Sequence, residues 1–425
     1  MSVADVDRTK PELGPDPARW PDVVGVPSGP AARLGAPVAA HLFRRAVERL
    51  DLRVEYPDGT TLGAGTGDAP RLIVHRPDRL ARRLAADGLI GFGEAYMAGD
   101  WTAPDPAAAL TPFAASAATL IPRPLQALRP ILLPGQPAAE RNSEQNTRSN
   151  VSRHYDLSND LFALFLDETL SYSSALFDGR PARWDTLVAA QHRKIDRLLD
   201  AARVGPGTRL LEIGTGWGEL AIRAARRGAT VRSVTLSAEQ QGLAQRRAAT
   251  AGHADAVTID LLDYRSVGGE FDAVVSVEMI EAVGYEYWPV WFATVDRVLV
   301  PGGRVALQSI TMPHDRMLAT RNTYTWMHKY IFPGGLLPSA EALERATAET
   351  ALRTTDRFGF GADYAATLRL WRERFTAHAA AVADLGFDET FRRMWELYLA
   401  YSEAGFRSGY LDVQQITLTK DGSPR

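Results

Sequence analysis

The sequence predicts an α/β fold, in which a doubly wound, largely parallel sheet follows a smaller α+β domain. Strand-like apolar segments alternate with amphipathic helical segments between residues 208 and 312. This alternation is typical of parallel strands joined by crossover helices. The chain has 425 residues, more than one hydrophobic core usually serves, so a companion domain is expected.

Composition divides the N-terminal part of the chain into three segments. Residues 1–35 are rich in Pro, Gly, Asp and Ala and are predicted to be a flexible tail. Residues 36–130 are predicted to form the small domain, because an amphipathic helix precedes hairpin-like and strand-like segments. Residues 131–150 are predicted to be a linker, since several prolines around its start forbid a long helix and a polar stretch follows.

Residues 151–425 are predicted to form one large domain around the sheet. A late strand-like segment, residues 410–420, could pair at the edge of this sheet and run antiparallel to its neighbour. The other predicted strands are residues 208–216, 229–237, 255–264, 271–279 and 304–312.

The composition excludes several classes of protein. The apolar fraction of 45% and the charged fraction of 23% are those of an ordinary globular protein, and a net charge of −3 gives no overall field for nucleic acid. The absence of cysteine excludes disulfides, a thiolate nucleophile and Cys-based metal sites, and no metal site is predicted. Since no signal-like or membrane-spanning segment is recognisable, a cytoplasmic protein is expected, with peripheral membrane association left open.

A glycine-rich turn is the first motif with chemical content. The strand that ends at Ile213 leads into Gly214, Gly216 and Gly218, where positive φ is accessible and a ligand can approach the backbone. Packing alone could explain such a turn. However, the spacing differs from the G-x-G-x-x-G dinucleotide fingerprint, and the next strand ends without the acidic residue that binds an NAD ribose. The turn therefore predicts S-adenosylmethionine (SAM) rather than NAD.

Further side chains complete the predicted SAM site. Glu212 precedes the turn, where an acidic residue positions the methionine part of SAM. Gln240 could reach the ribose, and Asp263 and Tyr264 follow the third strand, where they would flank the adenine. The predicted SAM-binding residues from this part of the chain are Glu212, Gly214, Gly216, Gly218, Thr235, Leu236, Gln240, Asp263 and Tyr264.

Several separated blocks resemble the cyclopropane-fatty-acyl-phospholipid synthase family. The blocks are residues 88–101, 154–178, 275–284, 329–339 and 404–420. The resemblance implies a class I SAM-methyltransferase fold for residues 151–425. It also places Tyr155, Tyr172 and Ser173 at the methionine end of SAM, where Tyr155 could otherwise simply open a capped helix.

The resemblance also implies a reaction. The cis double bond of a phospholipid acyl chain takes the methyl group of SAM, which leaves S-adenosyl-L-homocysteine and a carbocation on the chain. A base then removes a proton. In family members that close a cyclopropane ring, a bound bicarbonate serves as this base, in a pocket formed by a Cys, a Glu, a His and a Tyr.

This chain departs from that pocket. Its Glu and Tyr correspond to Glu281 and Tyr364, but Ser174 stands at the Cys position and Gln308 at the His position. Glu278 stands where a Gly is expected. Bicarbonate is therefore doubtful as a cofactor, and a protein carboxylate is favoured as the base or in place of the anion.

The altered pattern resembles the actinobacterial branch that makes 10-methylene fatty acids. There a hydride shift precedes proton loss from the new methyl group, and an oleoyl chain becomes a 10-methylenestearoyl chain. Glu144, in the polar segment before the catalytic domain, is a second candidate base in this branch. A separate reductase would then act on the product.

Three other readings stay open at this stage. One is cyclopropane-fatty-acyl-phospholipid synthase; another is a SAM methyltransferase of a small soluble molecule; the third is a SAM-binding regulator that has lost catalysis. A homo-oligomer is expected because enzymes of this kind usually form one. Residues 121–133, which mix arginines with apolar residues, could dock on an anionic membrane.

Overall fold

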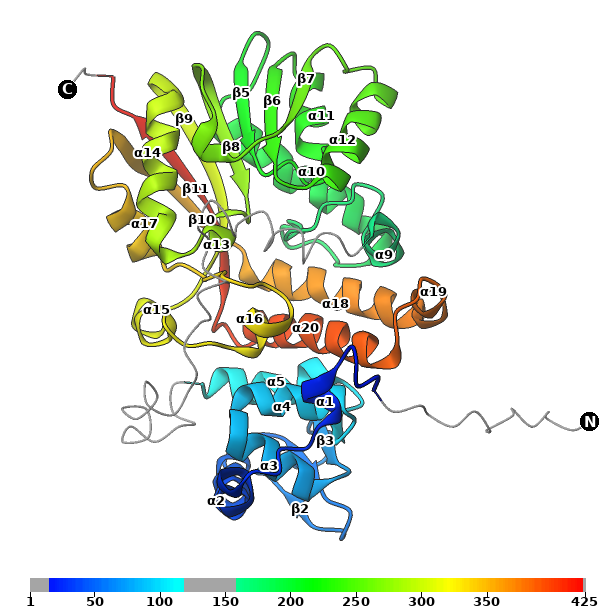
Figure 1. Cartoon of the computed structure of the whole chain (residues 1–425). Coiled ribbons are helices and arrows are strands. Elements are labelled where there is room, and N and C mark those ends of the chain that lie inside the picture. Colours follow the sequence, from blue (N-terminus) through cyan, green and yellow to red (C-terminus); the bar gives the residue numbers. More distant parts are fainter. Residues whose placement is uncertain (1–14, 118–157, 423–425) are drawn as a thin grey trace, which may run out of the picture. The chain divides into compact units, whose positions relative to one another are not determined.

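The structure, a computed structural model, describes residues 15–117 and 158–422, which belong to two compact units. The first unit comprises Met1–Pro104 and Gly386–Leu397, and the second comprises Asp105–Leu385 and Tyr398–Arg425. The described residues form a four-stranded sheet in the first unit and a seven-stranded sheet in the second. Figure 1 follows the chain through both sheets.

The first unit packs helices against a small mixed sheet of order β2-β1-β3-β4. Helices α2 and α3 lie side by side (Figure 1). Gly35 permits this close approach, because a Cβ there would lie 3.2 Å from the Cβ of Ala85 on α3. The elements are α1 (Pro21–Val24), α2 (Pro30–Val47), β1 (Arg53–Glu55), β2 (Thr61–Leu62), β3 (Arg71–Val74), α3 (Pro77–Asp87), α4 (Leu89–Met97) and β4 (Trp101–Thr102).

This unit differs from the predicted division of the N-terminal part. Residues 1–35 were expected to be a tail, yet α1 and the start of α2 fall inside them. Pro30 begins α2, where a missing N–H costs nothing, and Val23 and Ala32 are buried. The unit ends at Pro104 rather than at residue 130, and it gains the first half of α20 (Glu389–Arg407).

The second unit contains the predicted doubly wound sheet, in the order β10-β11-β9-β8-β5-β6-β7. The strands from β9 to β7 are parallel, while β11 runs antiparallel to β9 and to β10. The strands are β5 (Arg209–Ile213), β6 (Thr230–Thr235), β7 (Val257–Leu261), β8 (Phe271–Val277), β9 (Leu299–Thr311), β10 (Leu352–Gly359) and β11 (Asp412–Lys420).

Alternation along the strands creates a hydrophobic core on each face of this sheet. Leu210 belongs to the core with Ile195 of α10, and its neighbour Leu211 belongs to the core with Trp291 of α14. Figure 1 shows α10, α11 and α12 on one side of the sheet and α14 on the other. The helices of this unit are α5 (Pro106–Ala115), α9 (Asn159–Phe165), α10 (Trp184–Ala201), α11 (Glu219–Arg226), α12 (Ala238–Thr250), α13 (Ile280–Val283), α14 (Trp288–Val298), α15 (His314–Thr320), α16 (Trp326–Tyr330), α17 (Ala340–Ala346), α18 (Gly361–Ala377), α19 (Ala379–Asp384) and the second half of α20.

The late strand β11 is antiparallel, as predicted, but it is not at the edge of the sheet. The edge is β10, which lies outside β11 and carries mostly polar, solvent-facing residues. An exposed edge strand lacks the apolar pattern that identifies buried strands, and the sequence therefore gave no signal for it. Among the described residues, no helix is long and apolar enough to cross a membrane.

Candidate active site

The glycine-rich turn lies at the carboxyl end of β5 and opens a pocket there. Gly214, Gly216 and Gly218 all have positive φ, at 99°, 52° and 90°. A Cβ on Gly218 would lie 3.0 Å from the Cβ of Ala244, so this glycine lets the turn pack on α12. A Cβ on Gly216 would meet nothing within 4 Å, which leaves the backbone open to a ligand.

The pocket is lined by most of the predicted SAM-binding residues. It lies along the carboxyl ends of β5, β6 and β8, where open α/β sheets bind ligands. The predicted residues that line it are Tyr172, Ser173, Glu212, Gly214, Gly216, Thr235, Leu236, Gln240 and Tyr264.

Among the described residues, two predicted SAM-binding residues do not line the pocket. Gly218 caps α11 behind the turn, at the N-terminus of that helix. Asp263 is turned to Arg265 instead, with an Oδ2 to Nη2 distance of 2.6 Å. Tyr155 lies outside the described residues, as do Glu144 and residues 121–133. The expected roles of those unplaced segments stay predictions.

Glu212 supplies a buried carboxyl group beside the turn. Its Oε2 accepts a hydrogen bond from Ser233 Oγ at 2.5 Å, and Ser233 Oγ lies 2.7 Å from Thr215 Oγ1. Burial raises the pKa of Glu212 to about 8. A cationic ligand in the pocket would favour the charged carboxylate and so offset its desolvation.

Lys194 is a pocket residue that sequence reasoning missed. It lies on α10 with 2% of its surface exposed, and its Nζ donates a hydrogen bond to Ser173 Oγ at 2.5 Å. Burial lowers the pKa of Lys194 to about 8, although Glu278 and other carboxylates favour its charged form. One signal was present in the sequence: Gln191 and Lys194 are polar residues within the helix's buried stripe, at a spacing of three.

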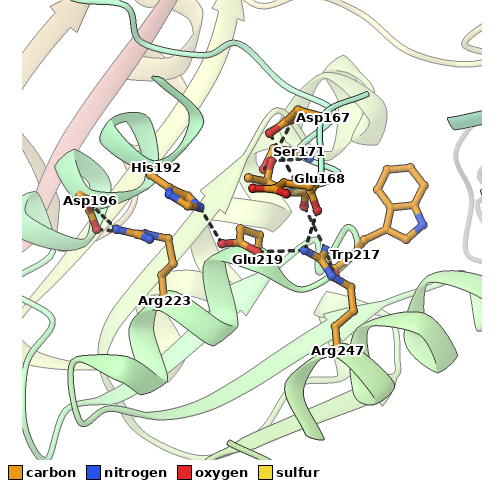
Figure 2. Close-up of polar contacts among 10 residues, drawn as sticks. Asp167, Glu168, Ser171, His192, Asp196, Trp217, Glu219, Arg223 and Arg247 are labelled. Carbon is orange, nitrogen blue, oxygen red and sulfur yellow. Dashed lines mark hydrogen bonds and ion pairs between the residues drawn. The ribbon is translucent and has the colours of Figure 1, made fainter. Parts of the chain in front are cut away.

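Arg247, also missed, fastens several pocket-lining segments together. From α12 it donates to the backbone oxygens of Thr169 at 3.0 Å and Trp217 at 2.8 Å. Its guanidinium also pairs with Glu219 at 2.9 Å, and Glu219 in turn contacts His192 at 2.9 Å (Figure 2). The glycine turn and the segment before Tyr172 are thus held by one side chain that does not line the pocket.

Glu278 is the centre of a second, side-chain cluster. Its Oε1 accepts hydrogen bonds from the backbone N–H of Ser174 at 3.0 Å and from Gln308 Nε2 at 2.8 Å, and its Oε2 accepts from Tyr364 Oη at 2.5 Å. Gln415 Nε2 donates to Gln308 Oε1 at 3.0 Å, which orients the amide so that its donor end faces Glu278. The structure therefore brings together four of the six predicted catalytic residues.

The backbone at Glu278 adopts a conformation that favours glycine. Its φ is +49°, at the end of β8, and its N–H donates to the carbonyl oxygen of Gln308 at 2.8 Å. A non-glycine residue in this region costs about 1–2 kcal/mol. Burial raises the pKa of Glu278, while the hydrogen bonds from Tyr364, Ser174 and Gln308 oppose that rise. Glu278 also lines the pocket at the glycine turn, so it belongs both to that pocket and to the side-chain cluster.

Glu281 lies beside this cluster but faces another way. Its Oε1 accepts from Ser309 Oγ at 2.9 Å and from the N–H of Ile310 at 2.5 Å. Burial and the nearby Glu278 raise the pKa of Glu281 to about 8. Its buried Oε2 has no hydrogen-bond partner among the described residues, and Glu281 does not line the pocket.

Ser174 contributes through its backbone rather than its hydroxyl group. Its Oγ donates to the carbonyl oxygen of Ala175 at 3.0 Å, and only its N–H contacts Glu278. Tyr364 is buried, and burial next to Glu278 raises the pKa of its phenol well above the ordinary value. The phenol is therefore neutral and acts as a hydrogen-bond donor to the carboxylate.

Known sequences resemble the chain over most of its length. The profile of the family described as mycolic acid cyclopropane synthetase matches residues 142–416. The chain is 57% identical to tuberculostearic acid methyltransferase UfaA1 of Mycobacterium tuberculosis over 97% of this chain and 98% of that protein. It is 35% identical to cyclopropane-fatty-acyl-phospholipid synthase of Escherichia coli, over 83% of this chain and 89% of the relative.

Solved structures also resemble part of the chain. The cyclopropane synthase MmaA2 of Mycobacterium tuberculosis is 33% identical, with a TM-score of 0.59, and the match covers 64% of this chain and 98% of that one. Mycolic acid cyclopropane synthase CmaA1, solved in complex with SAH and CTAB, is 32% identical with the same TM-score and coverage.

Proposed function

The chain belongs to the mycolic acid cyclopropane synthetase family, and from this we propose that it converts an unsaturated phospholipid acyl chain into a methylene-branched one. It is a SAM-dependent methyltransferase of fatty-acyl lipids. The proposed acceptor is the cis double bond of an oleoyl chain, and the proposed product is a 10-methylenestearoyl chain. Cyclopropane synthase is the alternative, because the Escherichia coli relative and the two structural relatives bear that name.

The residues of the pocket fit SAM as the methyl donor. Bound SAM supplies an electrophilic methyl group on a sulfonium centre. Gly216 offers an open backbone, Glu212 a buried carboxyl group, and Tyr264 a buried hydroxyl group without a partner among the described residues. We assign Ser173 and Lys194 to the carboxylate end of the donor, because a cationic Nζ beside a hydroxyl suits a carboxylate.

Two observations support the choice of product: the 57% identity to tuberculostearic acid methyltransferase UfaA1, and a glutamate at position 278 held in a glycine-type conformation with its carboxylate buried and hydrogen-bonded. A strained backbone of this kind persists only where the surrounding contacts hold it in place, and strained residues are concentrated at functional sites. The carboxylate of Glu278 accepts hydrogen bonds from Ser174, Gln308 and Tyr364. Since these donors already bind a side chain, the cluster supports Glu278 as the base instead of a bound bicarbonate.

The proposed chemistry uses this carboxylate after the methyl group has been transferred. The π electrons of the acyl double bond form the new C–C bond, and the adjacent carbon becomes cationic. A hydride then moves from the methylated carbon to that cation, so the positive charge lies next to the new methyl group. Glu278 accepts a proton from this methyl group, and the C–H electrons form the exocyclic double bond.

Further partners follow from this function. A reductase is needed downstream if the cell is to obtain a saturated 10-methyl chain. A homo-oligomer and peripheral membrane association also remain part of the proposal, and Glu144 remains a second candidate base. A soluble small-molecule acceptor is disfavoured by the 57% identity to a methyltransferase named for a fatty acid. An inactive regulator is disfavoured by the ordered, hydrogen-bonded Glu278.

Labelling in cells tests the proposal. The protein would be expressed in a host whose phospholipids carry oleoyl chains, with methyl-labelled methionine, and fatty-acid methyl esters would be analysed by mass spectrometry. A ring and an exocyclic methylene have equal mass, so derivatisation of the double bond must separate them. We expect one label per modified chain and a product that retains a reactive double bond. Absence of label in the lipids would refute the lipid acceptor.

A further inference from the structure

Helix α2 of the first unit presents an apolar stripe to solvent. Leu34, Val38 and Leu42 are 80%, 60% and 41% exposed. Their spacing of four residues places them on one face of the helix, about 40° apart in succession. An exposed row of large apolar side chains is unusual for a soluble surface and marks an interaction site.

The core of the unit does not account for this stripe. The face of α2 that packs on α3 contains Gly35, Ala32 and Val47, of which the last two are buried. The centre of that face is rotated by about 120° from the centre of the stripe, at 100° per residue. The helix is thus apolar on two faces, and one of them packs inside the unit.

The charged residues within α2 all carry the same sign, and the exposed Glu48 follows directly after the helix. The 18 residues of α2 include Arg33, Arg44 and Arg45 and no acidic residue. Arg44 lies over the ring of Tyr56 at 4.7 Å. Neither Arg33 nor Arg45 has a carboxylate within ion-pair distance among the described residues, and both are exposed. Arg45 falls on the same side of the helix as Val38.

We propose that this face of α2 docks on the surface of an anionic lipid bilayer. An exposed apolar stripe with Arg45 beside Val38 fits an interfacial helix, whose apolar face enters the lipid and whose cations meet anionic headgroups. An interface with a second copy of the chain is the alternative occupant, and the oligomeric state measured below separates it from lipid docking. The inference rests on the proposed function, because an enzyme whose acceptor is a membrane lipid must reach the bilayer.

Vesicle binding tests the proposal without any turnover. The purified full-length protein would be sedimented, in the absence of SAM, with vesicles of phosphatidylglycerol and phosphatidylcholine or of phosphatidylcholine alone. We expect preferential binding to the anionic vesicles, weakened by salt. The triple variant L34S/V38S/L42S and the charge variant R45E should each bind them about tenfold or more weakly.

A matched control separates the stripe from general surface hydrophobicity. Leu385 and Val290 are 39% and 41% exposed in the second unit, so L385S/V290S should bind vesicles as the wild type does. Melting temperature and methyl transfer to detergent-dispersed lipid should be unchanged in all these variants. Equal vesicle binding by the stripe triple and the wild type would overturn the docking proposal.

Two further outcomes are informative. If the stripe triple dissociated an oligomer on size exclusion and still bound vesicles normally, the face would be an interface between copies, and the proposal would be overturned. If the wild type bound anionic vesicles but methylated no lipid, the proposed function would fail while the docking surface stood.

Discussion

The two parts of the active site are built in different ways. The methyl-donor part is an open pocket whose shape comes from backbone conformations, chiefly the glycine turn after β5. The proton-accepting part is a filled cluster in which each oxygen of Glu278 has at least one donor. Under the proposed function, the first part binds the methyl donor, whereas the second part supplies its anion as a side chain.

The largest expected effect is the loss of activity when Glu278 is replaced, because this change should affect the proton-accepting part and spare the donor part. E278Q keeps the shape of the side chain but removes the base, so kcat for methyl transfer to oleoyl vesicles should fall by about 10²–10⁴-fold. SAM binding, measured by calorimetry, should change by only a few-fold.

The neighbouring carboxylate provides the control for this variant. E281Q should lose less activity, because Glu281 does not line the pocket. Turnover by E278Q near the wild-type rate, or a larger loss in E281Q, would reassign the base.

Lys194 connects the two parts, and its removal should act mainly on the donor. K194M removes the hydrogen bond to Ser173, and we expect the Kd for SAM to rise by about tenfold or more, as for other charged hydrogen bonds. Lys329, which lies on α16 and is absent from the pocket lining, gives the matched control K329M. Unchanged SAM affinity in K194M would remove Lys194 from the donor site.

The shift of the acid limb between the wild type and Y364F reports on the proton-accepting part, because Glu212 and Lys194 of the donor part titrate in both proteins. Glu278 must be ionised to accept a proton, and its pKa is raised by burial, so activity should be lost as the pH falls through a value above 4.5. The hydrogen bond from Tyr364 lowers this pKa, and Y364F should therefore move the acid limb of kcat upward by about one to two pH units. An acid limb that does not move would mean that another group accepts the proton.

The smallest effect concerns the backbone of the donor part. G218A should destabilise the protein by about 1–2 kcal/mol from its positive φ, plus the crowding against Ala244 at 3.0 Å. Gly252 also has a positive φ but has open space around it, so G252A isolates the conformational term. Denaturant unfolding should rank G218A below G252A, and equal values would show that the packing contact does not matter.

The donor part could be predicted from the sequence because its residues lie in short, local motifs. The turn at Gly214 and the strand ends at Glu212 and Thr235 lie within short motifs, and the strand–helix alternation placed them at one edge of the sheet. Asp263 does not line the pocket, and its carboxylate pairs with Arg265 two positions later, so its place beside the adenine stays a prediction. Lys194 was missed because a buried lysine looks like any other polar residue in a helix.

For the proton-accepting part, the residues could be predicted from the sequence, but the hydrogen bonds between them could not. Ser174, Gln308 and Tyr364 lie 104, 30 and 86 residues from Glu278, and only the fold brings their donors to one carboxylate. The positive φ of Glu278 was hinted at by the glycine expected there. In the fold itself, β10 was missed because an exposed edge strand has no apolar pattern.

Transfer of a ¹³C-labelled methyl group to oleoyl phospholipid by the purified protein, followed by NMR of the product, tests the central claim most directly. If Glu278 takes a proton from the methyl group after a hydride shift, the labelled carbon will appear as an olefinic CH₂ in an exocyclic methylene. A labelled carbon in a cyclopropane ring would contradict the account.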